Sequence, residues 1–329
     1  MRITTLCSGV IAAAASLLCA AGGAAAQGQG FPGKPVRIVP FGTAGGPVDT
    51  TARMYAEKLR ERWRQPVIVE AKPGASGTLA ADFVAKAPPD GTTFLITLSL
   101  THINNAILQK NIPYDPFRDF APLSQLAVGY GPALIAPAAA PFNDLRELIA
   151  YAKQKPAGVT YGTWGTGSTP HLFAEVLAKQ AGVRLVHVPY KGEGAAHLDL
   201  FGGTLDIAWA NSGTARTHLN SNRIKVLGAT GSRRSQVLAQ TPLFGEQGFE
   251  GFEPTTWIGA YAPAKTPPAI VNELSAALRE ATRQPDIAAR WLDIGFEPAG
   301  TTPEEFARIH KADFPKWAQM IKAAGLTAE

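Results

Sequence analysis

Two glycine-rich turns constrain the fold of this chain, because each one joins a strand-like run to the start of an amphipathic helix. The first turn, Gly42–Gly46, follows the apolar run Val36–Phe41, and Pro47 suits the first turn of the helix that comes next. The second turn, Gly165–Ser168, precedes a helix cap and first turn at residues 169–170. A strand–turn–helix unit that occurs twice predicts two similar α/β units.

Strands and helices alternate around both turns. Val48, Ala52, Tyr55 and Leu59 recur at spacings of three or four, which is typical of an amphipathic helix. Strands are expected at residues 36–41, 67–70, 92–98, 184–188, 205–208 and 224–228, with a further strand ending at residue 163. This alternation predicts an α/β fold built from two doubly wound, parallel sheets.

The C-terminal stretch is predicted to be helical. Thr302 and Glu305 have the spacing of a capping box, and Pro303 stands at the first helical position. We expect a kink at Pro315, because proline removes a helical hydrogen bond. His310 is interpreted as a packed surface histidine.

Residues 1–26 read as a signal peptide. Arg2 supplies the positive charge, Val10–Ala21 the apolar run, and Ala24–Ala26 the small-residue cleavage pattern, so Gln27 is the expected first mature residue. No later apolar run is long enough to span a bilayer. The sequence therefore predicts a protein that is exported from the cytoplasm.

Both cysteines, Cys7 and Cys19, fall inside this leader. A lipid anchor on Cys19 is an alternative, although Ser16–Leu18 poorly matches the small residues expected before it. Without disulfides or thiolate metal sites, a large hydrophobic core must stabilise the mature chain, whose length suggests two domains. The 31 Lys and Arg against 26 Asp and Glu are scattered, whereas a nucleic-acid site would concentrate them.

The two glycine-rich turns are the predicted binding site. Ligands of open α/β sheets bind outside the carboxyl ends of the strands, where both turns lie. Each turn should present backbone N–H groups and the positive end of a helix dipole, which suit an anion. Neither turn contains Lys or Arg, so backbone N–H groups and the hydroxyls of Thr43, Thr166, Ser168 and Thr169 would hold a carboxylate. Ordinary tight turns are the alternative.

Motifs of catalysis are incomplete. Pro170 replaces the third glycine of a dinucleotide-binding fingerprint, and Thr166 replaces the first glycine of a nucleophile elbow around Ser168. His171 could serve Ser168 as a base, which leaves a hydrolase as an alternative. The histidines show no ligand spacing, so we expect no metal, no cofactor and no enzymatic activity.

Several short motifs now point to a family. They include Lys34–Phe41 with Ala44–Gly46 and Asp49, then Ala87–Gly91, Pro113–Pro116, Gly165–Leu172, His187–Gly192 and Trp257–Gly259. In this order and spacing, over essentially the whole mature chain, they resemble the Bug family, the TctC-like extracytoplasmic binding proteins of tripartite tricarboxylate transporters.

The resemblance implies a type II periplasmic-binding-protein fold, with two lobes around a ligand cleft and two hinge crossings near residues 121–133 and 255–262. Residues 27–127 and 256–329 would form lobe 1, and residues 128–255 lobe 2. It also implies a periplasmic protein that captures a small di- or tricarboxylate or aromatic acid and delivers it to membrane subunits of a tripartite tricarboxylate transporter. A single two-lobed unit needs no partner to fold, so we expect a monomer. The residues predicted to bind the ligand are Phe41, Thr43, Ala44, Gly45, Gly46, Asp49, Ser99, Trp164, Thr166, Gly167, Ser168, Thr169, His171 and Asn211.

Three points stay open. Asp49 matches a motif aspartate of the family, but its place in the first helical turn also suits capping of the helix. Trp164, where the family usually has a small residue, either walls the cleft for an aromatic acid or packs under its loop. Ala210 stands where many relatives have an acid, which argues against a ligand with an ammonium group. A ligand-loaded co-sensor for a signalling system is the alternative to a transport receptor.

Overall fold

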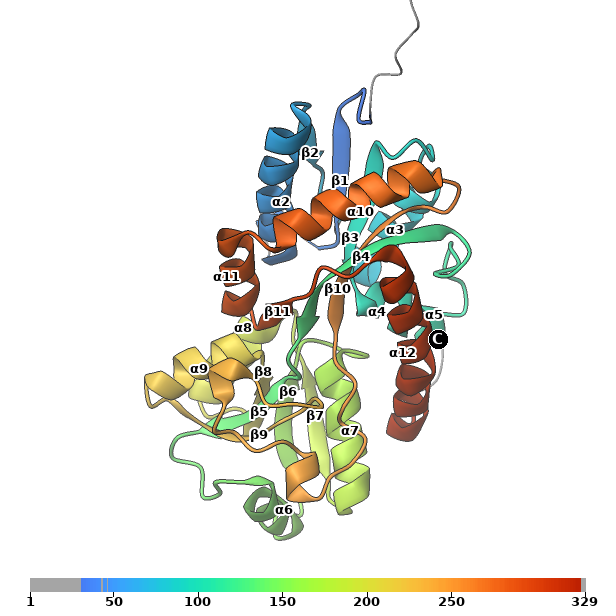
Figure 1. Cartoon of the computed structure of the whole chain (residues 1–329). Coiled ribbons are helices and arrows are strands. Elements are labelled where there is room, and N and C mark those ends of the chain that lie inside the picture. Colours follow the sequence, from blue (N-terminus) through green and yellow to red (C-terminus); the bar gives the residue numbers. More distant parts are fainter. Residues whose placement is uncertain (1–30, 43, 46, 327–329) are drawn as a thin grey trace, which may run out of the picture.

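Apolar, β-branched runs form the strands of two separate sheets, one in each of two lobes that lie one above the other in Figure 1. The computed structural model describes residues 31–42, 44–45 and 47–326. The predicted signal peptide and both cysteines lie outside the described residues. The two-lobed α/β architecture confirms the predicted fold class.

The upper sheet has the strand order β11-β4-β10-β3-β1-β2. β1 pairs in parallel with β2 and β3, whereas β10 runs antiparallel to β3 and β4. Its strands are β1 (Val36–Pro40), β2 (Val67–Val69), β3 (Thr93–Leu98), β4 (Phe120–Gly129), β10 (Trp257–Pro263) and β11 (Phe296–Pro298).

The lower sheet has the order β7-β6-β8-β5-β9. β6 pairs in parallel with β7 and β8, and β5 runs antiparallel to β8 and β9. Its strands are β5 (Ala133–Pro137), β6 (Val159–Thr163), β7 (Leu185–Pro189), β8 (Ile207–Ala210) and β9 (Ile224–Ala229).

The expectation of wholly parallel sheets is wrong for the strands that carry the chain between lobes. β4 leads directly into β5, and the chain returns into β10, so each sheet contains a strand that enters from the other lobe. β10 is inserted between β3 and β4, and β5 between β8 and β9, both in antiparallel pairing. The βαβ units themselves keep the predicted parallel pairing.

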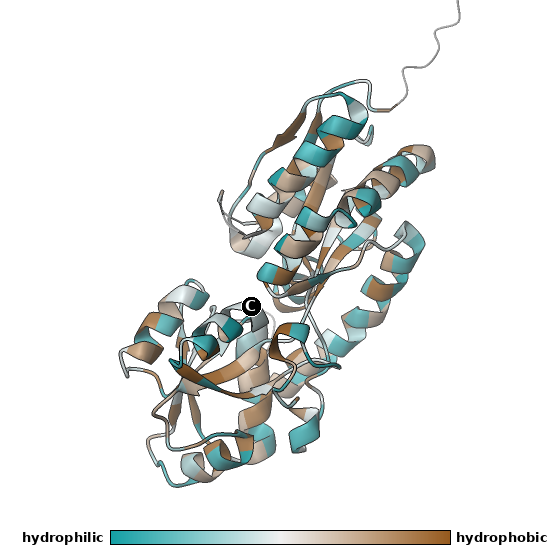
Figure 2. Cartoon of the chain, turned by 60° about the vertical axis from the view of Figure 1, so that its left-hand side comes forward, coloured by the Kyte–Doolittle hydropathy of each residue, from teal (hydrophilic) through white to brown (hydrophobic). Residues whose placement is uncertain are grey.

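Helices cover both sheets. In α2 the buried side chains are those that gave the predicted period, with Tyr55 and Leu59 at most 1% exposed. In Figure 2 the strands are largely brown, and the helices carry teal on their outer faces. Among the described residues, no helix is both long and apolar enough to cross a membrane. The α-helices are α2 (Pro47–Trp63), α3 (Thr78–Ala85), α4 (Ser99–His102), α5 (Asn104–Leu108), α6 (Leu145–Lys153), α7 (Thr169–Ala181), α8 (Glu193–Phe201), α9 (Ser212–Asn220), α10 (Pro268–Thr282), α11 (Pro285–Asp293) and α12 (Pro303–Ala324).

The two crossings between the lobes touch where the chain leaves β4 and enters β10. The Gly129 N–H donates to the Thr256 carbonyl at 2.7 Å across the two crossings, and within the connection from β9 to β10 the Gly231 N–H donates to the Phe252 carbonyl at 2.7 Å. A Cβ atom on Gly131 would lie 2.3 Å from the carbonyl carbon of Thr230, a distance that no side chain tolerates. Glycine therefore allows the two chain segments to approach this closely.

Helix α12 contacts both lobes. Its capping box at Thr302 and Glu305 is confirmed, and the helix continues through Pro315 as one element. Its second half packs on α7 of the lower lobe, where the Trp317 and Phe173 rings stack with centroids 6.2 Å apart. The last helix therefore joins the lobes as a third link beside the two crossings.

A cluster of buried aromatic rings lies under the first half of α12. His310 is only 2% exposed, so its interpretation as a surface histidine is wrong; it packs against Tyr261, and its ring centroid lies 5.7 Å from that of His102. His102 is fully buried, stacks on Tyr261, and has no hydrogen-bond partner on either ring nitrogen among the described residues. Burial lowers the pKa of His310 to about 4 and holds the pKa of His102 well below its ordinary value.

These two histidines should make stability fall on acidification. Below pH ~6.5 they gain protons in the unfolded chain while remaining neutral in the folded one, so the unfolded state is favoured. We expect His310 to contribute a loss of about 3 kcal/mol between pH 6.5 and 4. Urea unfolding of the parent and of His310→Phe across this range measures it. Equal pH slopes for both proteins would contradict the assignment.

Candidate functional site

The first glycine-rich turn joins β1 to α2 and is held from within the helix. The Gly45 N–H donates to Asp49 Oδ2 at 2.9 Å, and Arg53 Nε donates to the same oxygen at 2.8 Å. The Asp49 side chain is fully buried, so the structure favours the capping role that the sequence left open. Ala44 and Gly45 are exposed, while Thr43 and Gly46 lie outside the described residues.

The second glycine-rich turn joins β6 to α7 and is folded on itself. The Gly165 N–H donates to Thr163 Oγ1 at 3.3 Å, and both the N–H and the hydroxyl of Ser168 donate to the Gly165 carbonyl. The Gly167 N–H donates to His171 Nδ1 at 3.1 Å. The expectation that all N–H groups of this turn are unpaired is therefore wrong, because two of them are bonded to side chains next to the turn and a third to the Gly165 carbonyl.

Within the described part of the chain, three backbone N–H groups at or just before the start of α7 are unpaired. The backbone N–H groups of Thr166, Thr169 and His171 have no hydrogen-bond partner among the described residues, and the Ser168 side chain does not cap the helix. Thr169 is buried as the first residue of the 13-residue helix. These groups lie at the positive end of the helix dipole, which favours an anion.

A stack of two histidines supports this turn from below. The rings of His171 and His187 are nearly parallel, with centroids 4.0 Å apart. His187 Nε2 lies 2.6 Å from Thr163 Oγ1, and Glu175 accepts a hydrogen bond from the Tyr161 hydroxyl. The histidine stack therefore links the turn to β6, β7 and α7.

A cavity of about 260 Å³ lies between the lobes, at the second turn. Its lower wall comes from that turn, and its upper wall comes from α4, α5 and the short turn before α3. Among the described residues, no charged side chain lines it. The lining residues are Ser76, Leu100, Asn105, Leu108, Gln109, Trp164, Thr166, Gly167, Ser168 and Leu326.

Trp164 forms part of this wall rather than only packing under its loop. Its indole nitrogen Nε1 is buried and has no hydrogen-bond partner among the described residues. Leu100 and Leu108 line the same cavity from the opposite lobe. The ring and the two leucines give one part of the cavity an apolar surface.

Sequence reasoning missed the upper wall. Ser76 lies in a third glycine-containing turn, Gly74–Gly77, whose position after β2 was the available signal. Asn105 Nδ2 donates to the Ser76 carbonyl at 3.0 Å and so connects this turn to α5. The short helices after β3 contain no periodic pattern that would have indicated Asn105 or Gln109.

Two predicted residues take other roles in this structure. Ser99 is buried at the start of α4, where its hydroxyl oxygen accepts a hydrogen bond from the backbone N–H of Trp257 at 3.4 Å. The N–H and Nδ2 of Asn211 both donate to Glu193, at 2.8 and 2.7 Å. An acid thus does lie near the end of β8, but Glu193 is occupied by Asn211, and burial raises its pKa. Neither Ser99 nor Asn211 lines the cavity between the lobes.

Ser168 and His171 do not form a nucleophile and base. The Ser168 hydroxyl donates to the Gly165 carbonyl at 2.6 Å, whereas His171 Nδ1 accepts from Gly167. The other imidazole nitrogen, Nε2, lies 4.0 Å from Glu175 Oε1. Among the described residues, no group of three or more His, Cys, Asp or Glu side chains could hold a metal ion.

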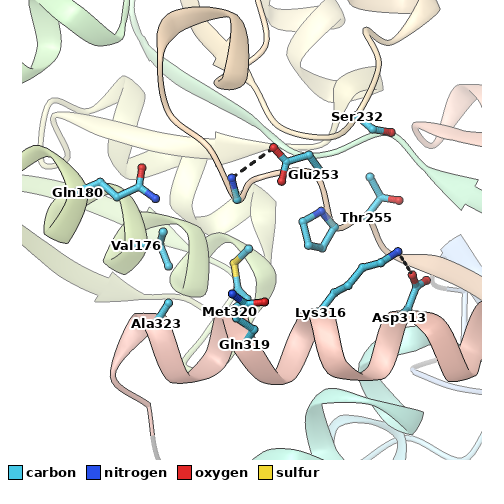
Figure 3. A pocket seen from close by; sticks show the side chains of 12 residues that line it. Val176, Gln180, Ser232, Glu253, Thr255, Asp313, Lys316, Gln319, Met320 and Ala323 are labelled. Carbon is cyan, nitrogen blue, oxygen red and sulfur yellow. Dashed lines mark hydrogen bonds and ion pairs between the residues drawn. The ribbon is translucent and has the colours of Figure 1, made fainter.

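A larger cavity, of about 610 Å³, lies between α7, α12 and the segment that enters β10 (Figure 3). Its charged groups are already paired: Lys316 Nζ lies 3.0 Å from Asp313 Oδ1, and Glu253 accepts from the Gly251 N–H. None of the described residues of the two glycine-rich turns lines it. The smaller cavity, with available donors on a helix start, is therefore the candidate site.

Two α/β lobes joined by paired crossings, with strand ends facing a shared cavity, define the class of two-lobed solute-binding proteins. Residues 51–326 match the family described as "TctC: Tripartite tricarboxylate transporter family receptor". The chain belongs to this family, and its resemblance to the Bug proteins is confirmed. The proteins of this family and their solved neighbours are binding proteins rather than enzymes.

Known relatives agree over nearly the whole chain. Protein BugT of Bordetella pertussis is 30% identical over 298 residues, which cover 90% of each chain. A protein of R. palustris solved with adipate is 31% identical, covers 91% of this chain and 100% of its own, and superposes with a TM-score of 0.79. MatC from Rhodopseudomonas palustris with bound malate is 30% identical, covers 88% and 100%, and gives a TM-score of 0.75.

Replacing Asp49 should loosen the first turn. In Asp49→Ala the Gly45 N–H loses its acceptor, which should lower the free energy of unfolding by about 1–3 kcal/mol. Arg53→Ala is the matched control, because that side chain is half exposed and its ion pair should contribute less than about 1 kcal/mol. Urea unfolding measures both variants. Equal losses would show that the Arg53 ion pair, and not the turn, carries the effect.

Proposed function

We propose that this protein is a periplasmic receptor that captures a small carboxylate and delivers it to the membrane subunits of a tripartite tricarboxylate-type transporter. The observation that carries the proposal is the cavity between the lobes, which is lined by Thr166, Gly167 and Ser168 of the second glycine-rich turn, just before the start of α7. Export through residues 1–26, a monomeric state and lobe boundaries at residues 127–128 and 255–256 are parts of the same proposal.

Neutral donors can hold a carboxylate at this place. The available donors are the N–H groups at Thr166, Thr169 and His171, together with the hydroxyl of Thr166. A hydrogen bond to a charged group contributes about 1.5–3 kcal/mol, so three or four such bonds offset much of the cost of removing one carboxylate from water. The dipole of α7 adds to this stabilisation, and the described lining of the cavity contains no charged side chain that would compete with it.

The relatives support a carboxylate as ligand. Adipate and malate are the molecules named with two solved neighbours that superpose over most of this chain. Both are small organic acids, and both carry two carboxylates. We propose the same chemical class for this protein, because the described lining of its cavity presents donors and contains no acid that would repel an anion.

Trp164 should favour acids with an apolar or aromatic body. The carboxylate would lie on the start of α7, and the rest of the molecule would reach Trp164, Leu100 and Leu108. Contacts with the aromatic ring and the leucines strengthen binding of a ligand with an apolar body, whereas they do not stabilise a second charged group. We therefore rank aromatic and long-chain acids above short di- and tricarboxylates for this chain.

Closure of the lobes would complete the site. The ligand would dock on the second turn, and rotation about the paired crossings would bring the upper wall, with Ser76, Asn105 and Gln109, onto it. Such closure requires that the ligand bind the closed state more tightly, and contacts from both walls provide this difference. Membrane subunits would then recognise the closed form.

A thermal-shift screen tests the binding function. Refolded protein is heated with adipate, malate, citrate, glutamate, benzoate and phenylacetate, and we expect a rise in Tm for one or more acids with an apolar body, since binding to the native state alone raises Tm. No shift with any of these acids would contradict the proposal. In cells, uptake that persists without the protein would instead favour the role of a co-sensor.

Replacing Trp164 tests the apolar wall. Trp164→Ala should weaken binding of the preferred acid by about 1–3 kcal/mol, equivalent to roughly tenfold or more in Kd, while Trp164→Phe should retain most of the affinity. Isothermal titration measures both. A Trp164→Ala variant that binds every acid as tightly as the parent would remove the wall from the proposal and leave the carboxylate site intact.

A further inference from the structure

We infer that carboxylate binding at the start of α7 releases the Gly167 N–H from His171, and that the imidazole of His171 takes up one proton as it does so. The inference rests on the proposed function and adds that ligand binding is coupled to the uptake of a proton. In this role His171 is a positioning residue of the turn in the empty state and becomes a ligand contact in the loaded state.

The hydrogen bond to Gly167 determines the protonation state of His171 in the empty protein. Nδ1 accepts from the Gly167 N–H at 3.1 Å, so Nδ1 carries no proton. The single proton of the neutral ring is then on Nε2, the nitrogen that lies 4.0 Å from Glu175 Oε1. The geometry thus assigns one tautomer to the empty site.

The surroundings of His171 keep it neutral while the site is empty. The residue is 7% exposed and stacks on His187, and burial lowers its pKa from the ordinary value. The groups that face it are Glu175 on α7 and His187 on β7; the Tyr161 hydroxyl on β6 bonds to Glu175. Burial and His171 together lower the pKa of His187 to about 4, so His187 is neutral as well.

A bound carboxylate reverses this preference. The anion lies next to the Gly167 N–H, whose acceptor in the empty state is the His171 side chain, and charge-assisted hydrogen bonds are stronger than neutral ones. Once Gly167 turns to the ligand, Nδ1 is left as an acceptor beside an anion. A proton from solvent then binds Nδ1 and creates a new N–H donor and a positive charge, which the carboxylate stabilises. No other bond forms or breaks.

The sign of the pH dependence follows from this linkage. The loaded state binds more protons than the empty state, so affinity should rise as pH falls through the pKa of His171 in the loaded protein. The rise has a limit of about tenfold per pH unit, and it levels off below the pKa of the empty state. Between about pH 6 and 8 the carboxyl groups of the ligand stay ionised and contribute no protons of their own.

Calorimetry measures the coupled proton directly. Adipate and phenylacetate are titrated into refolded protein near pH 6.5 in two buffers with different ionisation enthalpies, and we expect an uptake between zero and one proton per ligand bound. His171→Gln should bind without uptake, because its amide oxygen can accept from Gly167 but does not titrate. His218→Gln, a change on α9 outside the cavity, should keep the uptake. Binding by the parent without proton uptake would overturn the inference and leave the proposed function standing.

A second measurement needs no ligand. Nitrogen NMR of the imidazoles in the empty protein should place the proton of His171 on Nε2, and acidification through its titration should speed hydrogen exchange at the Gly167 amide. In His171→Gln that exchange should not follow the same pH course. A hydrogen-exchange rate at the Gly167 amide that does not change when His171 is protonated would overturn the inference. If neither acid binds, the proposed function fails for these acids, and this measurement still decides whether His171 controls the turn.

Discussion

The close pairing of the two chain crossings is the constraint on which the rest of the structure depends. The Gly129 N–H donates to the Thr256 carbonyl across the pair, and Gly131 approaches Thr230, just after β9, so closely that no side chain fits between them. This pairing inserts β5 and β10 into their sheets in antiparallel orientation. It also turns the carboxyl ends of β3 and β6 toward one another, so that the short helices of one lobe face the glycine-rich turn of the other across the cavity.

Much of this fold could be predicted from local sequence, because each βαβ unit leaves its own pattern. The period of Val48, Ala52 and Tyr55 gave α2, and the β-branched run before Gly42 gave β1. The mixed direction of the sheets could not be predicted in the same way, since nothing in the apolar run of β10 tells whether it pairs with β2 or between β3 and β4. Pairing partners distant in sequence depend on the whole fold.

The candidate site likewise has parts that local sequence predicts and parts that depend on residues distant in the sequence. The second turn and Trp164 were identified because glycine at a strand end and an unusual aromatic are visible in sequence. The self-pairing of the turn was not, because it depends on side chains that the fold brings under it: Thr163 at the end of β6 and His171 on α7. The bonds from Asn211 to Glu193 could not be predicted for the same reason, since Glu193 belongs to a different helix.

The packing of Trp317 on Phe173 has a consequence for how the chain unfolds. One buried cluster contains Leu95 of the upper sheet, Tyr161 of the lower sheet and both of these rings, so apolar packing passes from lobe to lobe through α12. Melting either lobe would expose the face that the other buries there. Although the chain has two sheets, it should therefore lose its structure in a single cooperative step, as a single-domain protein does.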